Sequence, residues 1–171
     1  MELSDPFVGT AKASLVLVGN VSKLPSKNQA QFTLSTAITA ATTECIADFA
    51  LFTNRGFTIS GKVTPTTRVE LSDSGANVYY TYPFTIQQGK LRKSYQNFAQ
   101  NVPVRLADML HTAQTITSFA KERQEDADLS ALLGSDLETL FFIADNSTVV
   151  VLRDLDHPVD GAPYEFWFGM R

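Results

Sequence analysis

Alternation of apolar and polar residues is clearest in the middle of the chain. Between residues 57 and 86 the apolar positions recur every second residue, as in strands that bury one face. Ser72-Asp73-Ser74-Gly75 interrupts this pattern with residues typical of a turn. We therefore expect a β-hairpin with strands within 57–71 and 78–86. Pro83 has no N–H to donate, which favours an edge position for the second strand.

Helical spacing of apolar residues predicts two main helices. Behind Pro103, apolar residues repeat every three or four positions and predict an amphipathic helix over 103–124. A weaker stripe from Leu34 to Phe52 predicts a helix over 35–53 that ends before Gly56. Several threonines in this second segment lower its helix propensity, because β-branched residues lose rotamer freedom in a helix.

The remaining apolar segments are shorter. We expect a strand over 12–21 and two strands, 140–143 and 148–152, around a tight turn. Between the 103–124 helix and these strands lies an acidic connector, 122–138, with a short helical segment over 129–133 that ends at Gly134. Residues 154–171 contain Pro and Gly and are expected to form a loop or tail. Its apolar residues would then dock on the core or on a partner.

These elements predict a single α+β domain over residues 1–171. We expect a mostly antiparallel sheet of about five or six strands, with the two main helices packed on one face. The length of 171 residues and the 44% hydrophobic content fit one domain and exclude global disorder. The apolar stretch from Ala13 to Gly19 spans only seven residues, including Ser14, so no transmembrane segment is expected. The start lacks the features of a secretory signal, and one cysteine forms no internal disulfide, so we expect an intracellular, cytoplasmic protein.

Charge is distributed unevenly along the chain, whose net charge is −4. Residues 1–121 hold 11 Lys and Arg against 7 Asp and Glu, whereas residues 122–171 hold 3 against 11. An acidic run of this kind is either a solvated connector or a contact surface that complements the basic part of a second copy. The candidate partner-binding residues are Glu122, Glu125, Asp126, Asp128, Tyr164, Phe166 and Trp167.

One basic segment combines cations with aromatic rings. Lys90, Arg92 and Lys93 precede Tyr95 and Phe98. In single-strand binders such cations pair with phosphates while bases stack on the rings. The segment is therefore a candidate nucleic-acid site, and the alternative is a loop that faces solvent.

Few residues suggest catalysis. Asp154, Asp156, His157 and Asp160 combine acids with a histidine, which suits acid–base chemistry or a divalent metal, although the same residues are common in turns. His111 is expected to be a partly buried structural histidine, and Cys45 an inert thiol on the apolar face of its helix. The glycines match no phosphate-binding motif. We expect no cofactor and no metal site.

The composition is low in charge, at 19%, and rich in Thr and aromatic residues. In this respect it resembles structural proteins of viruses and phages, which implies a self-associating matrix, coat or accessory protein associated with a virion. The first hypothesis is therefore a non-enzymatic assembly protein whose partner is itself or another protein. A nucleic-acid-binding accessory protein using the 90–93 segment is the alternative, and a small enzyme with its site at 154–160 is the third.

Overall fold

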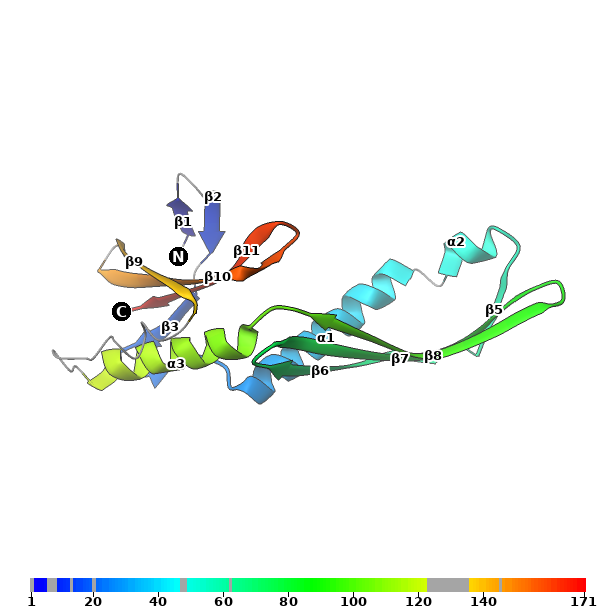
Figure 1. The fold of residues 1–171 in the computed structure, drawn as a ribbon, viewed down its shortest axis with the longest axis horizontal. Helices are drawn as coiled ribbons and strands as arrows, with labels where there is room; N and C mark the ends of the chain where they lie inside the picture. Colours follow the sequence, from blue (N-terminus) through cyan, green and yellow to red (C-terminus); the bar gives the residue numbers. More distant parts are fainter. Residues whose placement is uncertain are drawn as a thin grey trace. The chain divides into compact units, whose positions relative to one another are not determined.

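The chain forms two compact units in a computed structural model that describes residues 2–5, 9–12, 14–19, 21–46, 49–61, 63–122, 136–144 and 146–171 (Figure 1). Unit 1 comprises Met1–Ser26, Asp73–Gly75 and Pro103–Arg171, and unit 2 comprises Lys27–Ser72 and Ala76–Val102. The elements of unit 1 are β1 (Glu2–Asp5), β2 (Gly9–Lys12), β3 (Ser14–Val18), β4 (Val21–Ser22), α3 (Leu106–Glu122), β9 (Glu138–Ala144), β10 (Ser147–Val159) and β11 (Ala162–Met170). Those of unit 2 are α1 (Lys27–Ile46), α2 (Ala50–Thr53), β5 (Thr58–Ser60), β6 (Thr66–Ser72), β7 (Gly75–Gln88) and β8 (Leu91–Val102).

The predicted α+β class with mostly antiparallel pairing is confirmed, but the strands are divided differently. Unit 1 holds a five-stranded sheet of order β4-β3-β11-β10-β9 and the two-stranded sheet β1-β2. Unit 2 holds a four-stranded sheet in which β7 pairs with β5, β6 and β8. β3 and β11 pair in parallel. The two main helices belong to different units, and so do not share one face of one sheet.

The core of unit 1 forms between α3 and the five-stranded sheet. Met109, Ala113 and Ile116 lie on one helix face at the spacing the sequence predicts, and all three are buried. They join Val150, Leu152 and Phe168 from the sheet in one apolar cluster. The helix predicted over 103–124 is confirmed and begins at Leu106.

The C-terminal part of unit 1 is a pair of antiparallel hairpins. β9 and β10 confirm the strands predicted at 140–143 and 148–152. Residues 154–171 form the end of β10 and all of β11, instead of the expected loop or tail. The turn between them holds Asp160 and Gly161 at φ 52° and 81°, a left-handed pair that matches the twist of a tight hairpin. Residues 12–21, which were expected to form one strand, comprise the last residue of β2, all of β3 and the first residue of β4.

In unit 2, β6 and β7 confirm the predicted hairpin, but β7 is not an edge strand. It pairs with three other strands, and Pro83 lies where its register with β8 shifts between Thr81 and Phe84. A proline is tolerated at such an irregularity because no ladder hydrogen bond requires its N–H there.

α1 packs along β6 through polar side chains. The Ser35 hydroxyl accepts a hydrogen bond from the Val69 N–H at 3.0 Å, and the Gln31 carboxamide oxygen accepts one from the Leu71 N–H at 3.0 Å. The helix begins at Lys27 and ends at Ile46, earlier than the predicted 35–53, and α2 follows as a separate short helix. No residue of α1 is buried. α1 is thus held to the sheet by hydrogen bonds to the edge of β6 and not by a buried apolar face, which is the feature that a sequence pattern would detect.

We expect Ser35→Ala to destabilise unit 2 by about 1 kcal/mol relative to Thr43→Ala, because it leaves the Val69 N–H without its partner. The Thr43 hydroxyl is exposed and bonds only to the Thr39 carbonyl of its own helix. Both variants replace a hydroxyl residue of α1 by alanine and so gain helix propensity, but only Ser35→Ala removes a bond to the sheet. Urea unfolding followed by circular dichroism measures the difference. Equal stability of the two variants would contradict the role assigned to Ser35.

Candidate functional site

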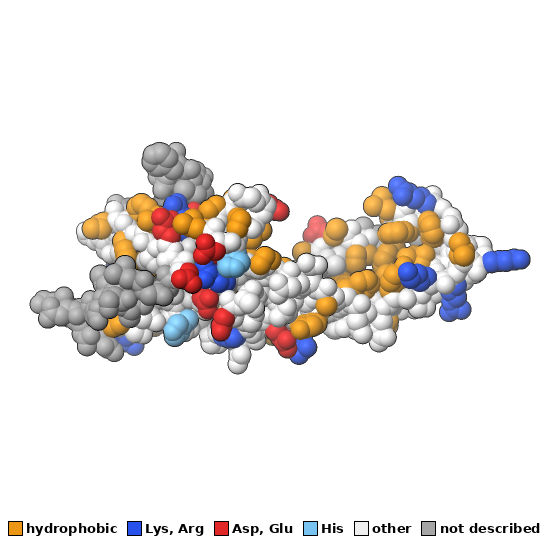
Figure 2. All heavy atoms as spheres, in the orientation of Figure 1, with side chains coloured by type: hydrophobic (Ala, Val, Ile, Leu, Met, Phe, Trp, Pro, Cys, Tyr) orange, Lys and Arg blue, Asp and Glu red, His pale blue; other side chains and the backbone are white. Residues whose placement is uncertain are grey.

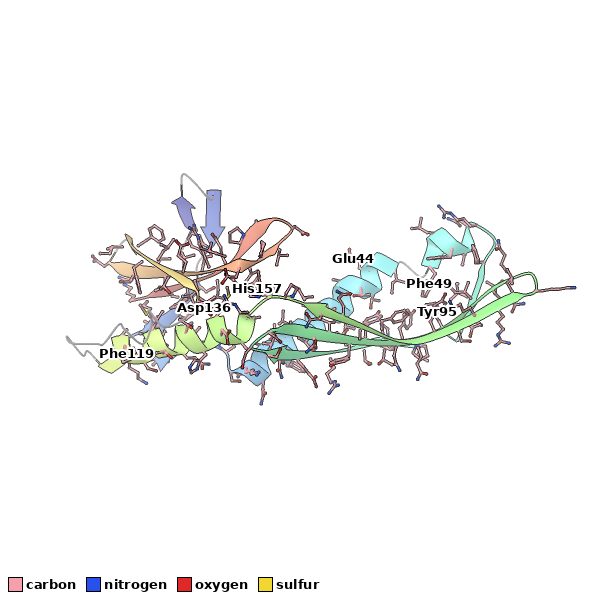
Figure 3. The ribbon with its side chains drawn as sticks, viewed as in Figure 1. Glu44, Phe49, Tyr95, Phe119, Asp136 and His157 are labelled. Atoms are coloured by element: carbon pink, nitrogen blue, oxygen red, sulfur yellow. The ribbon has the colours of Figure 1, made fainter. Side chains whose placement is uncertain are left out.

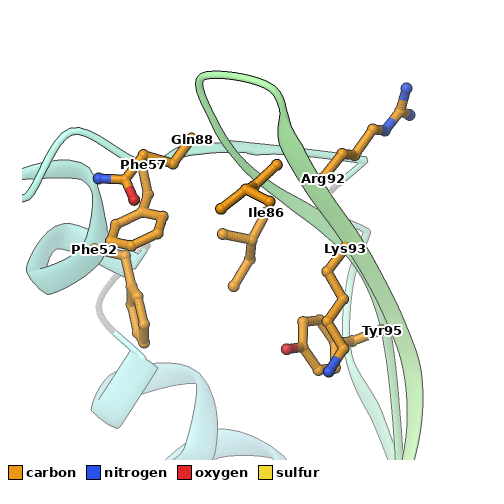
Figure 4. Close-up of a pocket in the computed structure, with 8 residues that line it drawn as sticks. Phe52, Phe57, Ile86, Gln88, Arg92, Lys93 and Tyr95 are labelled. Atoms are coloured by element: carbon orange, nitrogen blue, oxygen red, sulfur yellow. The ribbon is translucent and has the colours of Figure 1, made fainter.

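A pocket of about 480 Å³ lies where the β7–β8 hairpin meets α2 and the start of β5 in unit 2 (Figure 4). The antiparallel register places Ile86 opposite Lys93 and Phe84 opposite Tyr95. Because paired residues share a face, these side chains point to the same side of the sheet. The residues that line the pocket are Phe52, Phe57, Ile86, Gln88, Leu91, Arg92, Lys93 and Tyr95.

Phe49 anchors the short helix that carries one wall of this pocket. It adopts φ 62°, ψ 28°, a left-handed conformation that is unfavourable for a bulky side chain. Its ring is buried and contacts Phe84, with centroids 4.7 Å apart, and Tyr82, at 5.7 Å. Figure 3 shows Phe49 and Tyr95 at the same end of unit 2. Burial of the Phe49 ring thus holds α2 and its Phe52 beside the sheet.

Hydrogen bonds and ring contacts close the pocket on the α2 side. The Phe57 N–H donates to the Phe52 carbonyl at 3.2 Å, and the two rings meet edge to face at 6.2 Å. The Gln88 carboxamide donates to the Arg55 carbonyl at 3.4 Å, which joins the end of β7 to the turn after α2. These contacts hold the apolar wall of the pocket in place. Leu91, which is 77% exposed, lies at the open side of the pocket.

The pocket is surrounded by positive charge. None of its eight lining residues is acidic, and two of them, Arg92 and Lys93, are cations. The Lys93 ammonium lies 5.1 Å from the centroid of the Tyr95 ring, while Arg92 points outward (Figure 4). Figure 2 shows hydrophobic side chains gathered at this end of unit 2 with Lys and Arg around them. Such a site suits an apolar or aromatic group attached to an anion.

The structure brings together part of the predicted nucleic-acid segment. Arg92, Lys93 and Tyr95 line the pocket, Phe98 stacks beside Tyr95 with centroids 6.3 Å apart, and Lys90 lies in the hairpin turn. The alternative of a solvent-facing loop applies only to Lys90, since Arg92 and Lys93 lie in β8. Sequence analysis missed the apolar wall formed by Phe52, Phe57, Ile86 and Leu91. The pairing of β5 with β7, which places Ile59 opposite Ile86, brings this wall to the basic segment, and no local sequence pattern indicates that pairing.

The predicted acidic site at 154–160 contains a buried ion pair. Arg105, just before α3, donates from Nε to Asp154 Oδ2 at 2.9 Å and from Nη2 to Asp154 Oδ1 at 2.8 Å. Asp154 is fully buried, and His157 donates its backbone N–H to the same carboxylate at 3.2 Å. Hydrogen bonds from Arg105 lower the pKa of Asp154 to about 2 against the opposing effect of burial. This bidentate pair joins α3 to β10, a structural role that the sequence did not indicate for Arg105.

The acids around this pair remain exposed. Asp136 and Asp156 have oxygens 3.7 and 3.8 Å from the Arg105 guanidinium, with side chains 81% and 68% exposed. Asp136 and His157 lie beside the start of α3 in Figure 3. Asp160 lies in the β10–β11 turn. Among the described residues, no group of three or more His, Cys, Asp and Glu is placed to hold a metal ion.

The predicted partner-binding aromatic residues lie on opposite faces of β11. Tyr164 and Phe166 pack against the core cluster of unit 1, and burial raises the pKa of the Tyr164 hydroxyl. Trp167 faces the other side, where it stacks on Phe142 at 6.5 Å and donates its indole N–H to Glu165 at 2.8 Å. Because these three side chains point to opposite faces of β11, they do not form one exposed cluster.

The acidic segment is described only at its ends. Glu122 is the last residue of α3, whereas Glu125, Asp126 and Asp128 lie outside the described residues, as does the helical segment expected at 129–133. Two further expectations need correction. Cys45 and His111 are both exposed, because Cys45 lies on a helix with no buried residue and His111 lies beside the buried stripe of α3.

The division into units also divides the charge. Unit 1 holds seven Lys and Arg against fifteen Asp and Glu, which gives −8, and unit 2 holds seven against three, which gives +4. No helix in the described part of the chain combines the length and apolar character needed to cross a membrane. Comparisons with protein-family models, curated proteins and solved structures found no match.

The Asp154 ion pair predicts an acid-sensitive stability of unit 1. Because the folded pKa of about 2 lies below the ordinary value of 3.8, the stabilisation is complete above about pH 4 and is lost as the pH falls through 2. The shift corresponds to about 2 kcal/mol. Urea unfolding followed by Trp167 fluorescence at several pH values measures it, since Trp167 is the only tryptophan and lies in β11.

Asp154→Asn is expected to remove this pH-dependent component, while Asp156→Asn, at an exposed carboxylate, serves as the matched control and retains it. A wild-type pH dependence that persists in Asp154→Asn would contradict the assignment.

Proposed function

We propose that this chain is a non-enzymatic assembly protein that associates with copies of itself through one end of unit 2. This end, the pocket end, is formed by α2, the start of β5 and the β7–β8 hairpin. The observation that carries the proposal is the incomplete apolar core of that unit. Of the seventeen buried hydrophobic residues in the described chain, only Phe49, Val69, Leu71 and Tyr82 belong to unit 2. A folded unit of this length normally needs a larger core to offset its conformational entropy.

Exposed apolar residues of unit 2 support the same conclusion. Phe32 on α1, Leu51 on α2 and Leu91 on β8 are 75%, 76% and 77% exposed. At the pocket itself, Phe52 is 44% exposed, and Phe98, which stacks beside Tyr95, is 42% exposed. Apolar surface of this extent is typical of proteins that bury it against another protein.

Charge supports a second copy as the partner. The pocket end of unit 2 carries cations, and unit 1 carries a net charge of −8. Two pocket ends would repel each other, whereas unit 2 of one copy and unit 1 of the next attract. A contact between different surfaces repeats from copy to copy and builds rings or filaments. The compositional resemblance to viral and phage structural proteins supports the same class of function.

Light scattering on a sizing column tests this proposal at low and high salt. We expect a mass above one chain that falls as salt screens the charges. Leu91→Ser should raise the dissociation constant about tenfold or more, because full burial of a leucine contributes about 1.5–3 kcal/mol. Val21→Ser in β4, at an exposed position with no acidic neighbour in the sequence, is the control and should leave the constant unchanged. A wild-type monomer at high concentration and low salt would overturn the proposal.

A second candidate, single-stranded nucleic-acid binding, is favoured by the grouping of Arg92, Lys93 and Tyr95 at one pocket. The double variant Arg92→Glu and Lys93→Glu should abolish a salt-dependent mobility shift of a labelled oligonucleotide, because the phosphates lose two cations. The double variant Lys23→Glu and Lys121→Glu in unit 1 is the matched charge reversal and should preserve the shift. Absence of a shift with the wild type, or an unchanged shift with the double variant, would exclude this candidate.

A further inference from the structure

β9 is an edge strand whose outer side has no partner among the described residues. It ends the five-stranded sheet, and its inner side pairs with β10 from Glu138 opposite Arg153 to Ala144 opposite Ser147 without a register shift. The outer side of a regular edge strand presents a row of backbone N–H and C=O groups. β9 therefore has the backbone geometry to accept another strand.

The other edges of the two larger sheets are protected. β4 and β5 have two and three residues, so neither offers a long edge. β6 is covered by α1, whose Gln31 and Ser35 accept its backbone hydrogen bonds. β8 carries Arg92 and Lys93 and pairs irregularly with β7. Charges, short length and irregular register are the usual means of preventing strand addition. β9 has seven residues and a regular register, and its one charged residue, Glu138, lies at its end.

The side chains of β9 favour an apolar partner on both faces. Phe141, Phe142 and Ile143 are 49%, 37% and 88% exposed. Consecutive residues of a strand point to opposite faces, so both faces present apolar surface beside the open edge. After Glu138 the strand contains no charged residue and no proline.

We propose that β9 pairs with β9 of a second copy, antiparallel and about a twofold axis at Phe141, so that two five-stranded sheets join into one. In this register Glu138 lies opposite Ala144, Thr139 opposite Ile143, and Leu140 opposite Phe142. All seven residues are paired, no like charges face each other, and the two Glu138 side chains lie at opposite ends about 20 Å apart. Every other antiparallel register pairs fewer than seven residues, so the strand pairs along its whole length only in this arrangement.

This contact goes beyond the self-association proposed for unit 2 and uses a different surface. A twofold contact closes on itself and makes a pair, while the unit 2 contact repeats from copy to copy. A chain with both contacts builds an array of pairs. A chain with the β9 contact alone stops at two copies.

Site-specific disulfide cross-linking tests the register in the full chain. The background is Cys45→Ser, which removes the exposed native thiol. Residues at the twofold axis face their own copies with Cα atoms about 5 Å apart, a distance that a disulfide spans. We therefore expect Phe141→Cys to form a cross-linked dimer with a mild oxidant. Thr139→Cys and Ile143→Cys should each fail alone, since each residue lies about 14 Å from its own copy, and should cross-link when mixed.

Leu155→Cys, at another exposed position of the same sheet, measures collisional cross-linking. Trp167 fluorescence verifies that each variant is folded, because Trp167 stacks on Phe142 of β9. Equal yields at positions 139, 141, 143 and 155 would overturn the proposal, as would no cross-link in either the Phe141→Cys variant or the mixture. A cross-link by Ile143→Cys alone would show another register and also overturn it.

The outcome is separate from that of the unit 2 proposal. If β9 pairs as proposed, adding Leu91→Ser to the Phe141→Cys background leaves the cross-link yield unchanged. If only the unit 2 contact exists, Leu91→Ser changes the mass by light scattering while no register-specific cross-link forms.

Discussion

Backbone hydrogen bonding at strand edges is the constraint that explains most of this architecture. Each edge strand must have its N–H and C=O groups paired, covered or left to water. In unit 2 the chain covers β6 with the Ser35 and Gln31 side chains of α1, which accounts for a helix that is polar where it meets the sheet. In unit 1 the described residues leave the outer edge of β9 without a partner, and the β9 pairing that we propose uses this edge.

A second constraint acts at the junction of α3 and β10. Asp154 is fully buried in a strand, and a buried carboxylate needs a charged partner with matching geometry. Arg105 supplies it with two parallel hydrogen bonds and so fixes where α3 starts relative to the sheet. Two of the residues that suggested chemistry in the sequence thus have a structural role, since Asp154 accepts hydrogen bonds from Arg105 and from the backbone N–H of His157.

Elements held by apolar periodicity were predictable, and elements held by polar contacts were not. The stripe that contains Met109, Ala113 and Ile116 identified α3, and alternation identified β7. The start of α1 was missed because its stabilising bonds run from Ser35 and Gln31 to a strand edge, which leaves no apolar pattern. β11 was missed although Asp160-Gly161 is a recognised hairpin signal, because the Pro and charged residues before it suggested a loop.

The candidate site was predictable only in part, for a related reason. Arg92, Lys93 and Tyr95 are close in sequence, so composition revealed them. Phe52 and Phe57 reach the same pocket only through the pairing of β5 with β7 and the left-handed Phe49, which are long-range features. A sequence pattern relates residues that are close along the chain. The pocket wall comes from separate elements, so no such pattern indicates it.

Charge determines which contact can be symmetric in the assembly we propose. The pocket end of unit 2 combines apolar rings with cations, so two such ends repel and the surface needs an acidic counterpart. β9 has no charge between Thr139 and Ala144, so it meets its own copy without repulsion. In the proposed assembly, the apolar surface of the pocket end is therefore buried in an asymmetric contact and that of β9 in a symmetric one. This separation would allow a chain with so much exposed apolar surface to associate in order instead of aggregating.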